Sequence, residues 1–243
     1  MTRGTQNMLV LFIGLLIVRL VVTKGYLSYV RPDLWWLLLL AGTVMVLVSS
    51  ITLWTANEGS LRQKEQHPGH GNGAGWLLLL PLFALMAIDP SPLGAYAAGS
   101  RSARLPAIEA TANFPPLPVA EGGAVPLGLS DFSGRALYGE AEELDGLTVR
   151  LTGFVTPDPD LTDGFALTRF IVGCCAADAI PVQVIVHGGG PTPPGDTWLE
   201  VEGTWRMPDE PIPLEERQLT RVHLDATSVR VVEEPEAPYE SVF

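Results

Sequence analysis

A long uncharged apolar run, LWWLLLLAGTVMVLVSSITLW from Leu34 to Trp54, constrains this chain more than any other feature of its sequence. In an α-helix that rises 1.5 Å per residue, about 20 such residues cross the ~30 Å hydrocarbon layer of a bilayer. The run begins and ends with tryptophans, which are enriched at the two membrane interfaces. The sequence therefore predicts a transmembrane helix here, and a protein of the plasma membrane with the lipid bilayer as a partner.

Two weaker apolar segments flank this run. Met8 to Val22 is shorter and contains Arg19, whose long side chain can reach the headgroups from near a helix end. Trp76 to Ile88 is interrupted by Pro81 and followed by Asp89, so its length leaves open whether it spans. With the central run, these segments predict an anchor of about three transmembrane helices.

The predicted anchor covers residues 1–98 and includes a polar loop at 55–75. A cleavable signal peptide explains the first segment less well, because no small-residue cleavage site follows it and another apolar run comes at once. The positively charged residues are nearly balanced between the two sides, so they hardly decide the orientation. We expect the amino terminus inside and the C-terminal part outside the cytoplasm, because that part is acidic and rich in proline.

The formal net charge of −12 is concentrated after Ser100. Up to that residue there are six Lys or Arg and four Asp or Glu, whereas beyond it there are nine and twenty-three. Such a surface repels phosphate backbones, so we expect no nucleic-acid partner. Solubility alone explains the charge, and a cationic ligand or a basic partner surface is the alternative.

Residues 99–130 are rich in Pro, Ala and Gly and predict an extended linker, which is followed by a β domain at 131–235 and a tail at 236–243. Alternation of apolar and polar residues begins at Leu147, in LTVRLTGFV. Four more strands are expected at 165–172, 182–186, 198–205 and 228–232. Short strands with interior glycines at Gly153 and Gly203 favour a small OB-like barrel, with a β-sandwich as the alternative.

The cysteines of the chain are the neighbours Cys174 and Cys175, within RFIVGCCAADAIP. Three interpretations are open: a soft-metal site, a vicinal disulfide that responds to redox conditions, and two small buried side chains. Adjacent strand residues face opposite sides, so both thiols can hold one ion only if the chain turns, which Gly173 permits. Asp178, His187 and His223 are further candidate ligands.

No sequence motif of a hydrolase, kinase, dinucleotide-binding protein or zinc protease is present. GxSxG, GxxxxGK[ST], GxGxxG and HExxH are all absent. We therefore expect that the protein is not an enzyme and has no catalytic residues.

The order of apolar segments, the histidine-bearing loop, FALTRFIVGCCAADAIPVQVIV and the tail APYESVF together resemble the bacterial YcgQ-like family of permease subunits. Its most specific element here is the constellation Arg169, Phe170, Cys175, Ala177 and Asp178. The resemblance implies a separate multi-span permease as a partner. It also implies zinc or another divalent metal, because some members carry a loop dense in His and Cys.

These observations lead to three functional hypotheses. The first is an accessory subunit of a permease complex, with Arg169, Phe170 and Asp178 as candidates for binding a ligand or partner. The second is a membrane-tethered protein that binds or delivers metal through Cys174 and Cys175. In that hypothesis His67 and His70 form a separate collecting site, although two histidines supply only half of a tetrahedral zinc shell. The third is a thiol redox protein.

Overall fold

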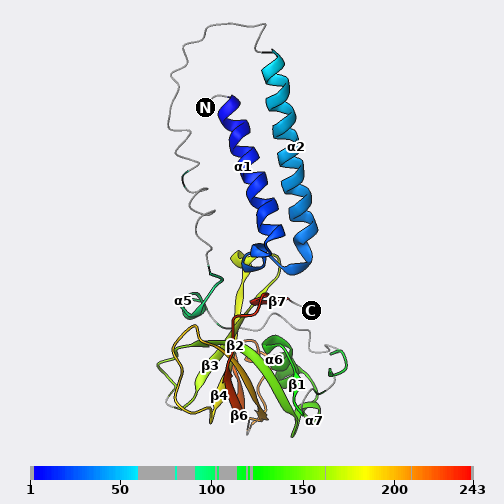
Figure 1. The fold of residues 1–243 in the computed structure, drawn as a ribbon. Helices are drawn as coiled ribbons and strands as arrows, with labels where there is room; N and C mark the ends of the chain where they lie inside the picture. The colour runs from blue at the N-terminus through cyan, green and yellow to red at the C-terminus, as the bar shows by residue number, and fades with distance from the viewer. Residues whose placement is uncertain are drawn as a thin grey trace. The chain divides into compact units, whose positions relative to one another are not determined.

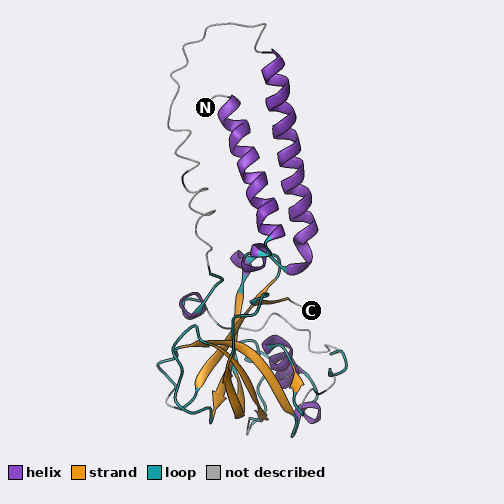
Figure 2. Ribbon diagram, viewed as in Figure 1, coloured by secondary structure: helices purple, strands orange, loops and turns teal. Residues whose placement is uncertain are grey.

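The computed structural model describes residues 3–59, 80, 91–101, 103, 114–118, 120, 123–161, 163–208 and 210–241. The chain divides into two compact units, Met1–Ser91 and Pro92–Phe243. The first is helical and the second is built mainly from strands (Figures 1 and 2).

The first unit is a pair of helices, α1 at Arg3–Val22 and α2 at Trp35–Gly59. The short 3-10 helices η1, at Gly25–Ser28, and η2, at Pro32–Leu34, connect them. The two backbones approach closely where Gly14 faces Gly42. A Cβ atom at Gly42 would lie 3.1 Å from the Gly14 carbonyl oxygen, so small residues make this packing possible.

Within the described residues, one helix is long and apolar enough to cross a membrane. It covers Pro32–Thr55, with a mean hydropathy of 2.2, and it includes the predicted central span. The apolar part of α1, Gln6–Val22, is shorter. The third candidate, Trp76 to Ile88, lies outside the described residues except for Leu80. The predicted three-span anchor is therefore not confirmed, and one apolar helix near the amino terminus fits either an anchor or a signal sequence.

The second unit is built on a closed ring of five strands. These are β2 at Thr148–Thr156, β3 at Phe165–Val172, β4 at Ile180–His187, β5 at Trp198–Arg206 and β6 at Val222–Val231. They follow the order β2–β5–β6–β4–β3, and β3 pairs with β2 to close the ring. All these pairs are antiparallel except β4 with β6. The ring agrees with the predicted small closed barrel.

The two interior glycines lie where strands approach closely, as the sequence predicted. A Cβ atom at Gly153 would lie 2.7 Å from the Thr168 carbonyl oxygen of β3. Gly203 lies at a β-bulge against β6, where a Cβ atom would collide with the Asp225 carbonyl. Any side chain at these positions would force the strands apart, so glycine permits the sharp coiling of a narrow barrel.

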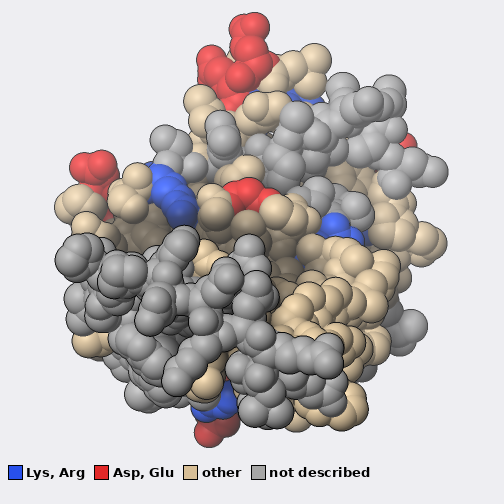
Figure 3. Space-filling view, turned by 90° about the horizontal axis from the view of Figure 1, so that it is seen from above, with Lys and Arg blue, Asp and Glu red and all other residues tan. Residues whose placement is uncertain are grey.

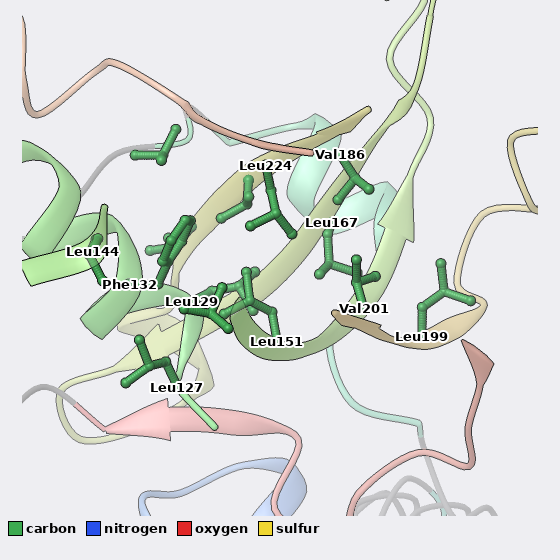
Figure 4. Close-up of a cluster of buried hydrophobic side chains, with 14 of the residues drawn as sticks. Leu127, Leu129, Phe132, Leu144, Leu151, Leu167, Val186, Leu199, Val201 and Leu224 are labelled. Atoms are coloured by element: carbon green, nitrogen blue, oxygen red, sulfur yellow. The ribbon is translucent and has the colours of Figure 1, made fainter. Parts of the chain in front are cut away.

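The barrel interior is filled by side chains that alternate along the strands, such as Leu151, Leu167 and Leu199, all fully buried. Helix α6, at Leu129–Tyr138, adds Phe132 to the same cluster (Figure 4). The short helix α7, at Ala141–Leu144, adds its last residue. Burying each large apolar side chain contributes about 1.5–3 kcal/mol, so this core stabilises the domain without disulfides.

The sheet extends beyond the predicted domain limits at both ends. Strand β1, at Val125–Pro126, lies inside the predicted linker and pairs in parallel with β2. Strand β7, at Tyr239–Ser241, lies inside the predicted tail and pairs in parallel with β3. Helix α5, at Ala95–Gly99, packs into a second apolar cluster with Phe154 and Phe170. The ranges 99–130 and 236–243, predicted as linker and tail, therefore contribute strands beside the predicted domain 131–235, because short segments with little apolar content still pair with existing edges.

Candidate functional site

The turn between β3 and β4 brings Cys174, Cys175 and Asp178 together. Their candidate ligand atoms, the two Sγ atoms and a carboxylate oxygen, all lie within 4.8 Å of one another. Gly173 leaves the strand, and the 3-10 helix η3, at Ala176–Asp178, reverses the chain. The chain therefore turns at the cysteines, which is the condition for both thiols to face one ion.

The carboxylate of Asp178 organises this turn through its hydrogen bonds. It accepts the backbone N–H groups of Gly173 at 3.1 Å, Cys174 at 2.8 Å and Cys175 at 3.4 Å. In return, the Asp178 N–H donates to the Cys175 sulfur, which completes a capping box around η3. Asp178 is therefore a structural residue of the turn as well as a possible ligand.

The two thiols are accessible and are not joined in a disulfide bond. Cys174 is exposed and Cys175 is partly buried. Their Sγ atoms are 3.6 Å apart, whereas a disulfide bond is about 2.05 Å long. The interpretation as two buried structural cysteines is therefore wrong for this turn. The redox hypothesis stays a prediction that this geometry does not test.

Charge and hydrogen bonding keep the Cys174 thiol protonated. Its hydrogen bond to Asp178, followed by its contact with Cys175, raises the pKa of Cys174 to about 11. For Asp178, desolvation acts to raise the pKa, but the hydrogen bonds from the Cys174 thiol and from the three backbone N–H groups outweigh it and lower the pKa. An ion that binds here must displace the Cys174 proton.

The donor set suits a soft or borderline divalent ion. Zinc lies about 2.3 Å from thiolate sulfur, and tetrahedral angles then separate two sulfurs by about 3.8 Å. The observed 3.6 Å is close to that separation. Two sulfurs and one carboxylate leave a fourth position open, as in exchange or catalytic sites rather than closed structural ones.

Arg169, a predicted binding residue, is a clamp on the C-terminal segment. Its guanidinium donates to the carbonyls of Ala237 at 2.7 Å and Pro238 at 3.2 Å, and it lies over the Trp198 ring. Burial lowers the pKa of Arg169, and Glu240 opposes this effect. The carbonyl contacts account for this arginine without a ligand.

Phe170, another predicted binding residue, has no solvent-exposed surface. Its ring packs against Phe154 at 5.9 Å and against Tyr239 at 6.4 Å, and Arg101 lies over it. We conclude that Phe170 holds β7 and the segment around α5 to the barrel. It does not reach a ligand in this arrangement.

The histidines divide into two groups. His67 and His70 lie outside the described residues. His187 and His223 stack at a ring separation of 5.1 Å, and Nε2 of the first lies 2.8 Å from Nδ1 of the second. Among the described residues, the metal-ligand cluster includes the two cysteines and Asp178 but neither of these histidines.

Arg135 is a buried charge that the sequence did not single out. It has 1% exposure and pairs with Asp131 at 2.9 Å and Glu143 at 2.5 Å. It also donates to the Pro115 carbonyl at 2.7 Å, which holds part of the predicted linker against α6. The spacing of Asp131 and Arg135 by four helical residues was the available signal.

Basic side chains do not gather on the described part of the face shown in Figure 3. The Lys and Arg groups there lie apart from one another among acidic and uncharged residues. A nucleic-acid interface needs a basic stripe that tracks the phosphates. The described residues of this face form no such stripe.

A comparison with models of known protein families gave a match to the barrel. Residues 134–241 match the DUF1980 C-terminal domain, an uncharacterised family. The match covers the five ring strands, β7 and the cysteine turn, but less than half of the chain. Neither the curated proteins nor the solved structures gave a match.

Proposed function

We propose that this chain is a membrane-anchored accessory subunit of a permease complex, in which the barrel is the binding module. The observation that carries the proposal is the exposed apolar surface of α2. Leu40 and Ile51 are each 57% exposed, and Leu47 is 55% exposed. In water such a surface is unfavourable, whereas lipid or the spans of a partner would cover it.

The strand order supports a binding module of the OB type. Three consecutive strands, β2, β3 and β4, form antiparallel neighbours, and the last strand, β6, pairs in parallel with β4. β5 then joins β6 to β2. This is the closed five-stranded Greek-key arrangement of OB barrels, which serve as binding domains in many unrelated proteins.

Purification from native membranes tests the proposal. The full chain is extracted in mild detergent after brief cross-linking, and its companions are identified by mass spectrometry. We expect a multi-span membrane protein in stoichiometric amount. A chain recovered by itself, with and without cross-linking, would contradict the partnership.

A second candidate function, metal binding or delivery, is favoured by the cluster of Cys174, Cys175 and Asp178. Both thiols are accessible, and the separation of their sulfurs fits one tetrahedral ion. Zinc there would be a cargo that exchanges at an open position. The preference for sulfur would extend to cadmium and Cu(I).

Elemental analysis of the full chain, reduced and dialysed against zinc, distinguishes this function. We expect about one zinc per chain, and none after Cys174→Ser with Cys175→Ser. Asp163→Asn is the matched control, because it removes an exposed carboxylate outside the cluster. Equal zinc content in the wild type and the double serine variant would remove the metal hypothesis but leave the permease proposal intact.

A further inference from the structure

A cavity of about 400 Å³ opens on the barrel away from the cysteine turn. It lies between α6, the end of β5, the beginning of β6 and the loop that joins these two strands. Its volume is within the range of small-molecule sites, which are typically ~300–1,000 Å³. No functional hypothesis from the sequence involves it.

Most of the cavity wall is apolar. Leu137 and Val222, at 7% and 4% exposure, are its most buried residues. Trp205 and Ile212 are partly buried and pack against the core. The loop is held in place by Arg217, which donates to the Ile212 carbonyl at 3.0 Å and lies over the Tyr138 ring of α6. The loop that forms one wall of the cavity is therefore held in place by contacts within the barrel domain.

The polar part of the wall is cationic. Arg206 of β5 lies directly across from His223 of β6, and Arg221 precedes the same strand. No Asp or Glu is among the described residues that line the cavity. In a chain with a net charge of −12, a cavity edge formed by two arginines and a histidine is unusual.

The arginines keep donors available despite their ion pairs. Arg206 uses Nε and Nη2 for Asp225, and Arg221 uses Nη1 for Asp158, and neither carboxylate lines the cavity. Among the described residues, these bonds leave Nη1 of Arg206 and two nitrogens of Arg221 for another acceptor. The ion pairs also fix both guanidinium groups in place, which reduces the entropy lost when an anion binds.

We propose that this cavity binds a small anion with an apolar body, such as an aromatic carboxylate. The apolar part would occupy the wall around Leu137 and Trp205, and the carboxylate would accept hydrogen bonds from Arg206 and Arg221. Charge-assisted bonds of this kind are about twice as strong as neutral ones. The proposal concerns the barrel alone and does not depend on the permease partnership or on the cysteine site.

Calorimetric titration of the full chain in lipid nanodiscs tests it with three probes of one shape. These are 2-naphthoate, the uncharged 2-naphthamide and the cationic 2-naphthylmethylamine, each corrected for protein-free nanodiscs. We expect the carboxylate to bind about tenfold more tightly than the amide, because only it uses the arginines fully. We expect the amine to bind most weakly.

Variants separate the charged edge from general electrostatics. Arg206→Gln and Arg221→Gln should each weaken 2-naphthoate about fivefold and weaken 2-naphthamide much less. Arg230→Gln is the matched control, since Arg230 of β6 pairs with Glu200 of β5 but does not line the cavity. We expect no change there.

A filling variant tests the apolar part. Ala136→Leu should weaken the carboxylate and the amide alike, while thermal unfolding shows that the barrel is still folded. Three outcomes would overturn the proposal: no binding of 2-naphthoate, equal binding of carboxylate and amide, or equal losses in Arg230→Gln and Arg206→Gln.

Discussion

The helical pair exposes many of its large apolar side chains, whereas the barrel buries them. In α2, large apolar residues such as Leu40 and Leu47 are more than half exposed, and α2 approaches α1 closely where Gly42 faces Gly14. In the barrel, Leu151 and Phe132 are fully buried among other large side chains. This difference is what we expect if the two units meet different solvents, since water favours burial of large apolar residues and lipid does not.

The largest effect should come from emptying the barrel core. Phe132→Ala removes a fully buried ring, so the free energy of unfolding of the barrel should fall by about 3–5 kcal/mol. Amide hydrogen exchange of β3 and β4 in the full chain measures this. Leu47→Ala in α2 is the control and should change the same amides by less than about 0.5 kcal/mol. Equal effects of Phe132→Ala and Leu47→Ala on these amides would contradict the difference between the two units.

The next effect concerns the packing of the two helices. Gly42→Leu places a side chain where a Cβ atom already lies 3.0 Å from Val18 and 3.1 Å from the Gly14 carbonyl, so the helices must separate. The cost of such overpacking is about 1–3 kcal/mol. Spin labels at Ile13 and Val44, in a background without the native cysteines, should report a longer distance.

Ala41→Leu is the matched control for the helix pair, because Ala41 is the exposed neighbour of Gly42. Its label distance should equal that of the parent. An unchanged distance in Gly42→Leu would show that the glycines do not set the separation.

Removing the Arg169 contacts with the C-terminal segment should destabilise the barrel only locally. Arg169→Met removes two hydrogen bonds to the partly buried carbonyls of Ala237 and Pro238, and each lost hydrogen bond costs about 0.5–1.5 kcal/mol. The amides of β7 should exchange faster, while those of β5 stay protected. Uniform loss of protection across the barrel would instead show that Arg169 stabilises the whole domain.

A smaller, pH-dependent effect should come from His223. Desolvation, followed by the positive charges of His187, Arg206 and Arg221, lowers the pKa of His223, and Asp225 opposes this. As the pH falls below about 6.5, the unfolded chain therefore takes up the proton first, and the barrel loses stability until the folded pKa is also passed. Urea midpoints between pH 8 and pH 5 should fall in the wild type and fall less in His223→Phe.

Alkylation of Cys174 gives a chemical readout of the turn. With its pKa raised to about 11 from 9.0, its thiolate fraction at pH 9 is roughly fiftyfold below that of an ordinary thiol. The reduced, metal-free protein should therefore react slowly with iodoacetamide at Cys174. Asp178→Asn should speed the reaction, because the main cause of the raised pKa is removed.

Much of the fold was visible in the sequence, because alternating apolar residues mark strands that pack on a core. All five ring strands and the roles of Gly153 and Gly203 follow from local patterns. Strand β6 begins at Val222, earlier than the predicted Ser228, although Val222 and Leu224 already alternate with His223 and Asp225.

Features that depend on long-range pairing could not be predicted. β1 and β7 are too short for a periodic pattern, and they exist because neighbouring edges accept their hydrogen bonds. Gly173 permits the turn at Cys174 and Cys175, but the residue that organises the turn, Asp178, is identified only by the three backbone N–H groups that its carboxylate accepts. The cavity near Trp205 is lined by a helix, two strands and a loop, so the sequence of no single segment predicts it.

The most direct test of the two-solvent account is alkaline carbonate extraction of native membranes, followed by peptide mapping of the chain. The account predicts that the chain stays in the membrane pellet and still contains α1 and α2. A chain released into the supernatant, or one recovered without its first 59 residues, would show that the apolar helices do not anchor the mature protein.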